Sequence, residues 1–188
     1  MTYDEALEYI HSMPVFSGTL KFEKTKILSD TDLLTGLLNR NAMNNRITAI
    51  VTGEDSLNGE YGVIFADLNG LKTVNDRDGH IAGDKLLKAA GNMLRDTFSG
   101  SDIFRVGGDE FLVIITDKDE VEFENLALEL RRKTENSDFV KFAIGTCFGD
   151  SSLDIRTAMH IADERMYEDK DQFYKDHPEM QHRIVTKE

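Results

Sequence analysis

A short acidic turn between two apolar runs constrains this chain more than any other feature. Residues 103–104 lead into the turn and residues 111–115 lead out of it, and both runs are apolar. Two apolar runs joined by a tight glycine-containing segment predict a β-hairpin, here with the sequence Gly-Gly-Asp-Glu over residues 107–110 at its tip. The two glycines permit positive φ and the close approach of a ligand to the main chain. The tip therefore presents two adjacent carboxylates, Asp109 and Glu110.

Adjacent carboxylates need water, a basic partner or a metal ion, because burying them unpaired is costly. A solvated hairpin tip explains this segment alone, but a second acidic strand end favours a functional site. Residues 61–66 predict a short buried strand that ends at Asp67. If the strands are neighbours, Asp67 and Asp109 converge at one edge of a sheet, where oxygen ligands suit Mg²⁺ carrying a triphosphate. The alternative is that Asp67 only caps the turn that follows it.

Composition limits the class of protein. The 188 residues suffice for one domain with a short appendage. With 22 basic and 35 acidic side chains the net charge is −13, which argues against a nucleic-acid-binding surface. A lone cysteine, Cys147, excludes a disulfide framework. No apolar run reaches the length of a membrane span and no secretory signal opens the chain, so we expect a soluble, cytoplasmic protein without membrane contact.

Hydrophobic periodicity predicts the order α-β-α-β-β-α-β-α. We expect helices at residues 30–50, 81–94, 121–132 and 152–174. We expect strands at residues 61–66 and 139–148, and the hairpin described above lies between these two strands in the sequence. This order indicates an α/β (α+β) fold with a mixed, mainly antiparallel sheet flanked by helices. We expect residues 1–29 to form an N-terminal arm, residues 30–175 the domain, and residues 176–188 a frayed tail.

Four motifs in order resemble the GGDEF domains, which are diguanylate cyclases. They cover roughly residues 30 to 175, and they are Asp32-Leu33-Leu34-Thr35-Gly36-Leu37-Leu38-Asn39-Arg40, the stretch 65–76 with Gly79-His80 and Gly83-Asp84, the signature 107–111, and Ala162-Asp163-Glu164-Arg165-Met166-Tyr167 with Lys170. The resemblance implies the palm-like fold shared with adenylyl cyclases and polymerases. It also implies a Mg²⁺-dependent (or Mn²⁺-dependent) cyclase that makes the bacterial second messenger cyclic di-GMP.

The resemblance assigns roles to the acidic strand ends. It implies that Asp67 and Asp109 hold the metal ions, with help from the main-chain carbonyl of Leu68. Glu110 is then either a further ligand or a group that helps to deprotonate the attacking hydroxyl. Asp67, Asp109 and Glu110 are thus the expected catalytic residues.

The turn after Asp67 is the expected phosphate site. Gly70, Leu71 and Lys72 should offer main-chain N–H groups and one positive charge to phosphate oxygens. By resemblance, Lys170 contacts the phosphates from the last helix. Many members carry a second basic residue four positions later, whereas this chain has Tyr174, which predicts modestly weaker triphosphate binding.

Asn75 and Asp84 are the expected base-reading residues. A carboxylate accepts the N1–H and the amino group of guanine, and an asparagine complements the N3 and amino edge. The resemblance implies this use at both positions, and Asp84 then favours GTP over ATP. Asp84 could equally serve as an acidic residue in the first turn of a helix. We expect His80 to be a structural turn residue.

A second departure concerns regulation. Many members carry Arg-x-x-Asp upstream of the signature as an inhibitory product site, but this chain has Phe-Ser-Gly-Ser at 98–101, and Asp102 is displaced by one position. We therefore expect no product inhibition through that site.

The leading hypothesis is a diguanylate cyclase that joins two GTP into cyclic di-GMP with release of two pyrophosphates, in a symmetric homodimer. The first alternative is a catalytically silent module that binds GTP and regulates a partner. The second is a cyclase with relaxed base choice, against which Asp84 argues. No long heptad repeat precedes the domain, so we expect a weak dimer, or none, in isolation.

Overall fold

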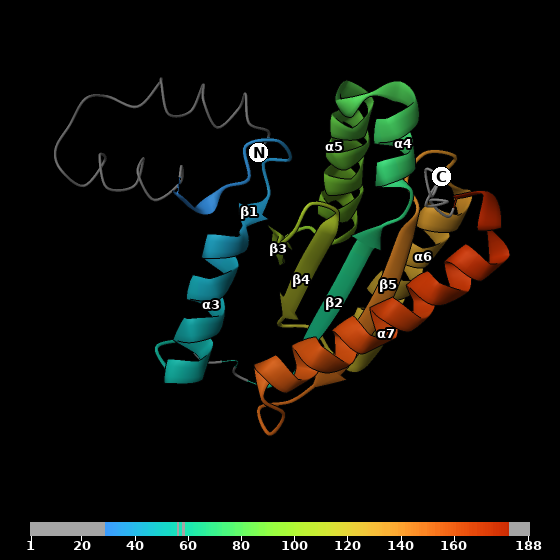
Figure 1. Ribbon diagram of the computed structural model, residues 1–188. Helices are drawn as coiled ribbons and strands as arrows, with labels where there is room; N and C mark the ends of the chain where they lie inside the picture. Colours follow the sequence, from blue (N-terminus) through green and yellow to red (C-terminus); the bar gives the residue numbers. More distant parts are fainter. Residues whose placement is uncertain (1–28, 56, 58, 181–188) are drawn as a thin grey trace, which may run out of the picture.

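A five-stranded sheet forms the centre of the molecule (Figure 1). The computed structural model describes residues 29–55, 57 and 59–180. The strand order is β1-β3-β4-β2-β5. The strands are β1 (Leu38–Asn39), β2 (Tyr61–Leu68), β3 (Asp102–Arg105), β4 (Glu110–Thr116) and β5 (Phe142–Gly149).

The sheet is mixed and mainly antiparallel, as predicted. The short strand β1 runs parallel to β3, whereas β3–β4, β4–β2 and β2–β5 are antiparallel pairs. The predicted hairpin is confirmed as β3 and β4, in which Phe104 faces Leu112. Strand β2 lies between β4 and β5 and is almost wholly buried, which explains its continuous apolar sequence.

Helices cover both faces of the sheet, as Figure 1 shows. One face packs on α5 (His80–Thr97) and α6 (Glu120–Asn136), and the other on α3 (Arg40–Thr52) and α7 (Ile155–Asp176). Successive β2 side chains alternate between these layers: Ile64, Ala66 and Leu68 belong to the first core, and Tyr61 and Val63 to the second. Asp67 shares the parity of Tyr61 and Val63, so it faces α7.

Local sequence explains where the helices begin. Asp119 and Glu122 form a reciprocal capping box at the start of α6. Asp154 accepts hydrogen bonds from two main-chain N–H groups at the start of α7. Asn39 accepts one such hydrogen bond at the start of α3, from the N–H of Ala42. Each cap satisfies N–H groups that have no partner within the helix.

Glycine sets how closely α7 approaches the sheet. A Cβ on Gly145 of β5 would collide with the main chain of α7 at Ala162 and Met166. The backbones of α7 and β5 are therefore in direct contact, and a side chain at this position would separate them. This packing fixes the height of α7 above the edge strand, and with it the position of Lys170.

The structure corrects one predicted helix start and adds two elements that were not predicted. The first helix begins at Arg40, not near residue 30, because residues 32–36 form a turn in which Thr35 donates two hydrogen bonds to the Asp32 carboxylate and Gly36 has φ 69°. Strand β1 was not predicted, and neither was helix α4 (Leu71–Asp78). A two-residue strand and a polar eight-residue helix carry too little hydrophobic periodicity to be recognised.

The described chain continues a few residues past the predicted end of the last helix. Helix α7 continues to Asp176, and a 3₁₀ helix, η1 (Pro178–Met180), follows it, so the chain is ordered beyond Lys175. Most of the expected N-terminal arm and the end of the expected tail lie outside the described residues. Within the described part, no helix combines the length and the apolar character needed to cross a bilayer.

Candidate active site

The expected catalytic carboxylates meet where β2 ends and β4 begins. Asp67 lies directly opposite Glu110 in the antiparallel register, and the N–H of Leu68 donates to the main-chain oxygen of Asp109 at 2.9 Å. Asp67 is buried, Asp109 is half-buried and Glu110 is exposed. The structure thus brings together the acidic groups that the sequence placed at separate strand ends, and it does so through main-chain pairing.

The signature turn does not use its glycines as expected. Neither Gly107 nor Gly108 has a positive φ. A Cβ on Gly107 would instead collide with the carboxylate of Glu110, whereas nothing lies within 4 Å of the corresponding position at Gly108. The first glycine therefore makes room for the Glu110 side chain. The N–H groups of Val106 and Gly107 both donate to the Glu110 carbonyl and close the turn.

Lys170 reaches from α7 to Asp67. Its Nζ lies 2.8 Å from Oδ2 of Asp67, whose side chain is 4% exposed. Burial raises the pKa of Asp67. The nearby charges of Asp109 and Glu110 raise it further, and Lys170 offsets this rise only in part. Burial alone would lower the pKa of Lys170, but its hydrogen bond and charge interaction with Asp67 outweigh that effect and raise it. Burial thus decides the direction of the pKa shift at Asp67, whereas the ion pair decides it at Lys170.

Unpartnered polar atoms gather at the same place. Among the described residues, the buried side-chain atoms without a hydrogen-bond partner are Oδ1 of Asp67 and both amide atoms of Asn69. Buried polar groups are rarely left unpaired, so this cluster points to a ligand that completes it. Within the described chain no three acidic, histidine or cysteine side chains converge as a ready cation site. Magnesium needs only one or two carboxylates beside main-chain oxygen, water and phosphate, so the donor set fits this ion.

The backbone of the expected phosphate turn adopts a left-handed conformation that favours glycine at position 70. Gly70 has φ 78° and precedes α4, and its carbonyl accepts the first helical hydrogen bond from Val74. Its N–H donates to Oη of Tyr174 at 3.4 Å. Leu71 opens α4 and is half-buried, while Lys72 is exposed. The turn therefore lies at the N-terminus of a helix, which favours anions, and Tyr174 covers it from α7.

The expected base-reading residues lie on the α4–α5 helical hairpin. The side-chain oxygen of Asn75 packs against the Cα of Gly83, where a Cβ would collide with it. Asp84 is the next residue, and it is exposed on α5. The structure thus brings Asn75 beside the start of the Gly83-Asp84 segment. His80 is the first residue of α5 and is exposed.

Sequence reasoning missed the group that supports the signature turn. Arg105 donates to the Gly108 carbonyl through Nε at 3.2 Å and Nη2 at 2.7 Å. Its Nη1 lies 3.2 Å from both carboxylate oxygens of Asp32. Asp32 belongs to the opening motif and Arg105 lies two residues before the signature, but their spacing of 73 positions gave no signal that they meet.

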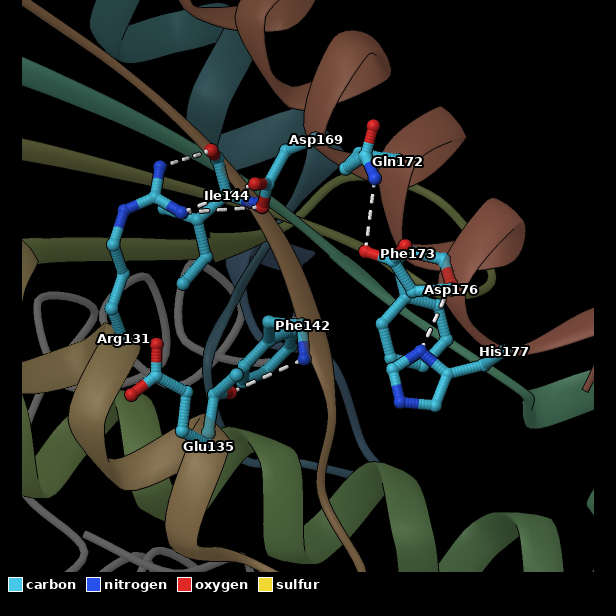
Figure 2. A pocket seen from close by; sticks show the side chains of 10 residues that line it. Arg131, Glu135, Phe142, Ile144, Asp169, Gln172, Phe173, Asp176 and His177 are labelled. Atoms are coloured by element: carbon cyan, nitrogen blue, oxygen red, sulfur yellow. Dashed lines mark hydrogen bonds and ion pairs between the residues drawn. The ribbon is translucent and has the colours of Figure 1, made fainter.

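A separate pocket lies on the other flank of α7, between α6 and the free edge of β5 (Figure 2). Arg131 donates to the Ile144 carbonyl and pairs with Asp169, which itself accepts from the Ile144 N–H. These contacts pair main-chain groups of the edge strand with side chains and so block the addition of another strand. None of the acidic strand ends lines this pocket, so we regard it as structural.

Sequence comparisons agree with this geometry. The family described as "Diguanylate cyclase, GGDEF domain" matches residues 29–175. The diguanylate cyclase DgcP of Escherichia coli is 32% identical over 152 residues, which cover 76% of this chain and 45% of DgcP. The cyclic di-GMP phosphodiesterase PdeR of the same organism is 38% identical over 106 residues, or 56% of this chain and 16% of PdeR. The chain thus spans less than half of these relatives.

Solved structures agree with the fold. A sensory box/GGDEF family protein from Caulobacter crescentus superposes with a TM-score of 0.58 at 30% identity, over 76% of this chain and 99% of that one. The coiled coil and GGDEF domain of DgcB from the same species, in complex with c-di-GMP, gives a TM-score of 0.68 at 19% identity over 81% of this chain and 86% of that one. With the family match over residues 29–175 and the paired acidic strand ends, the chain belongs to the GGDEF domain family.

Proposed function

We propose that this chain is a diguanylate cyclase that condenses two GTP molecules into cyclic di-GMP and releases two pyrophosphates. One observation carries the proposal: Asp67 lies opposite Glu110, and Leu68 is hydrogen-bonded to Asp109, so three carboxylates occupy one edge of the sheet. A family member that had lost its chemistry would have no need to bury the Asp67 carboxylate beside Asp109 and Glu110.

The carboxylates are proposed to hold divalent metal. Asp67, Asp109 or Glu110, and the main-chain carbonyl of Leu68 would bind Mg²⁺ or Mn²⁺. When bound, the ion would neutralise the triphosphate and lower the pKa of the attacking 3′-hydroxyl. The Asp67 carboxylate is buried at the end of β2, and Lys170 supplies a positive charge beside it. Glu110 is the most exposed of the three, and the proposal gives it a role as a ligand or in removing the hydroxyl proton.

The proposed substrate position extends from the phosphate turn to the α4–α5 hairpin. The N–H groups of Gly70 and Leu71 and the charges of Lys72 and Lys170 would bind phosphate oxygens. Asn75 and Asp84 would read the edge of guanine, where a carboxylate accepts two adjacent N–H donors. Adenine offers a lone pair at N1 instead, so Asp84 would disfavour ATP.

Each chain would hold one GTP, so the reaction needs two copies. The 3′-hydroxyl of one GTP attacks the α-phosphate of the other, a P–O bond forms, and pyrophosphate leaves. The same step in the opposite direction closes the ring. Two identical half-sites facing each other are the arrangement of a two-fold symmetric dimer.

Product formation from GTP and Mg²⁺ tests the proposal across a range of protein concentrations. We expect cyclic di-GMP from the wild type, with a rate that rises faster than linearly with protein, and at least about a 100-fold loss in Asp109→Asn. Lys118→Ala is the control, since among the described residues this exposed side chain pairs with Glu122, away from the proposed site. Absence of cyclic di-GMP at every protein concentration would refute the proposal.

A silent GTP-binding module is the second candidate. It is favoured by the ion pair of Lys170 with Asp67, which occupies a carboxylate that the catalytic metal ion would need. This candidate predicts that the chain binds GTP and forms no product at any concentration. Equilibrium binding of GTP measured beside the product assay separates the two functions.

A further inference from the structure

The end of α7 and the helix η1 lie on the phosphate turn. Tyr174 Oη accepts the hydrogen bond from the Gly70 N–H, and the Thr73 hydroxyl donates to the Met180 carbonyl at 3.3 Å. The Met180 Cε lies 2.8 Å from the position that a Cβ on Gly70 would take. The turn is therefore contacted both by the last turns of α7 and by the segment that follows it.

These contacts imitate those of a phosphate group. A hydroxyl oxygen of Tyr174 and a carbonyl oxygen of Met180 lie at the first turn of α4, where the free N–H groups and the helix dipole favour oxygen ligands that carry negative charge. Four residues before Tyr174, Lys170 is paired with Asp67. A single stretch of chain thus occupies an N–H group of the phosphate turn and a carboxylate of the proposed metal site.

The stretch is held in place by its own packing. The rings of Phe173 and His177 stack with centroids 4.4 Å apart, and Phe173 packs edge-on against Tyr174 at 5.4 Å. The His177 Nδ1 lies 3.0 Å from the Phe173 carbonyl, a contact drawn in Figure 2. The Met180 N–H donates to the His177 carbonyl at 3.0 Å and closes η1. The conformation of this segment is therefore supported independently of its contacts with α4.

The contacts with α4 are weak by comparison. Their donor–acceptor distances of 3.4 and 3.3 Å are long for hydrogen bonds to an oxygen. A triphosphate with its metal ion would form shorter, charge-assisted bonds to the Gly70 N–H and the Thr73 hydroxyl. The segment is therefore well placed to leave the turn when a nucleotide arrives.

We propose that residues 174–180 are an intramolecular cap that competes with nucleoside triphosphate for the phosphate turn and must withdraw before GTP binds. We call this segment the C-terminal cap. The inference rests on the proposed function, because it takes GTP as the ligand of the turn. It also gives Tyr174 a role: a residue that replaces a basic side chain here supplies the oxygen that covers the Gly70 N–H.

Binding of 3′-deoxy-GTP with Mg²⁺, measured by calorimetry, tests the cap without turnover, because this analogue lacks the attacking hydroxyl. A chain that ends at His177 keeps α7 and its C-cap but loses η1, and we expect it to bind about 3- to 10-fold more tightly than the wild type. Tyr174→Phe should bind about 2- to 3-fold more tightly, because it loses one long hydrogen bond. Gln172→Ala, which removes an exposed contact with Asp176 on the other flank of α7, is the control and should match the wild type.

Hydrogen exchange gives the second readout. We expect the analogue to increase amide exchange in residues 174–180 of the wild type as the C-terminal cap withdraws, and no increase in the core strands. Equal or weaker binding by both variants, or greater protection of the cap on binding, would overturn the cap while leaving the proposed function intact. If the truncated chain fails to fold, Tyr174→Phe alone decides. No binding by the wild type or by any variant would refute the proposed function and the cap with it.

Discussion

Arg105 joins Asp32 to the signature turn: its Nη1 lies 3.2 Å from both Asp32 carboxylate oxygens while its Nη2 donates to the Gly108 carbonyl. Asp32 also accepts hydrogen bonds from the N–H and the hydroxyl of Thr35. The side chains of Arg105 and Asp32 are only 14% and 22% exposed, so solvent screens the pair weakly. The opening motif of the domain thus positions the loop that carries Asp109 and Glu110.

Substituting Asp32→Asn should therefore affect both stability and activity. The variant loses the charge that holds Arg105, and we expect the free energy of unfolding to fall by about 1–2 kcal/mol. Urea unfolding measures this loss, and the product assay should show a lower turnover because Arg105 no longer fixes the turn. Asp30→Asn is the control, since Asp30 contacts only the exposed Asn41 amide among the described side chains. Equal losses in both variants would argue against a specific role for Asp32.

The same pair predicts how stability depends on pH. Burial alone would raise the pKa of Asp32, but hydrogen bonds from Thr35 and the charge of Arg105 outweigh it and lower the pKa. The folded pKa is below the unfolded one, so this contribution is fully present above the unfolded pKa of about 3.8 and is lost as the pH falls through the folded value. The stability difference between wild type and Asp32→Asn should therefore shrink between about pH 5 and pH 3. A constant difference over that range would contradict the assignment.

Asp67 should behave in the opposite way. Its folded pKa is raised above the unfolded value, so the stability linked to its proton is present at low pH and is lost as the pH rises. At neutral pH the buried charge opposes folding. We expect Asp67→Asn to melt about 2–4 °C above the wild type while losing cyclic di-GMP synthesis. The control is Asp109→Asn at a half-buried carboxylate, which should lose synthesis without the gain in melting temperature. A lower melting temperature for Asp67→Asn would show that its ion pair with Lys170 outweighs burial.

Gly145 should tolerate no side chain. Its Cβ would meet the α7 main chain, which cannot move aside as a flexible side chain would. We expect Gly145→Ala to lower the free energy of unfolding by about 1–3 kcal/mol in urea titrations, and Lys170 to lose its position above Asp67. Gly108→Ala serves as the stability control, because nothing lies within 4 Å of its Cβ position. Equal free energies of unfolding in the two variants would show that the close packing of α7 on β5 does not contribute to stability.

Cyclic di-GMP should not inhibit the proposed cyclase activity through the segment before the signature. Residues 98–101 lack the Arg and Asp of the inhibitory motif, and Asp102 pairs instead with Arg46 at 2.9 Å. Titration of cyclic di-GMP into the product assay should leave the rate unchanged until its concentration approaches that of GTP. Inhibition at far lower concentrations would require a product site elsewhere on the molecule.

The sequence by itself determined the fold class, the family and the set of acidic strand ends. The apolar runs of β2 and β4 and the glycine-containing turn between β3 and β4 are local signals, and they sufficed to predict the hairpin and a buried strand ending at Asp67. The sequence did not predict β1 and α4, because β1 is too short and α4 too polar to carry a recognisable hydrophobic periodicity. It also placed the first helix too early, because the turn made by Asp32, Thr35 and Gly36 replaces its first residues.

Only the tertiary structure decided which of these groups meet. The register of β2 against β4 sets Asp67 opposite Glu110, and the height of α7 over Gly145 brings Lys170 to Asp67 and Tyr174 to Gly70. The contact of Arg105 with Asp32 joins positions 73 residues apart. Such pairings depend on how sheets and helices pack across the whole domain. Local propensity carries no information about them, so composition and spacing could not predict them.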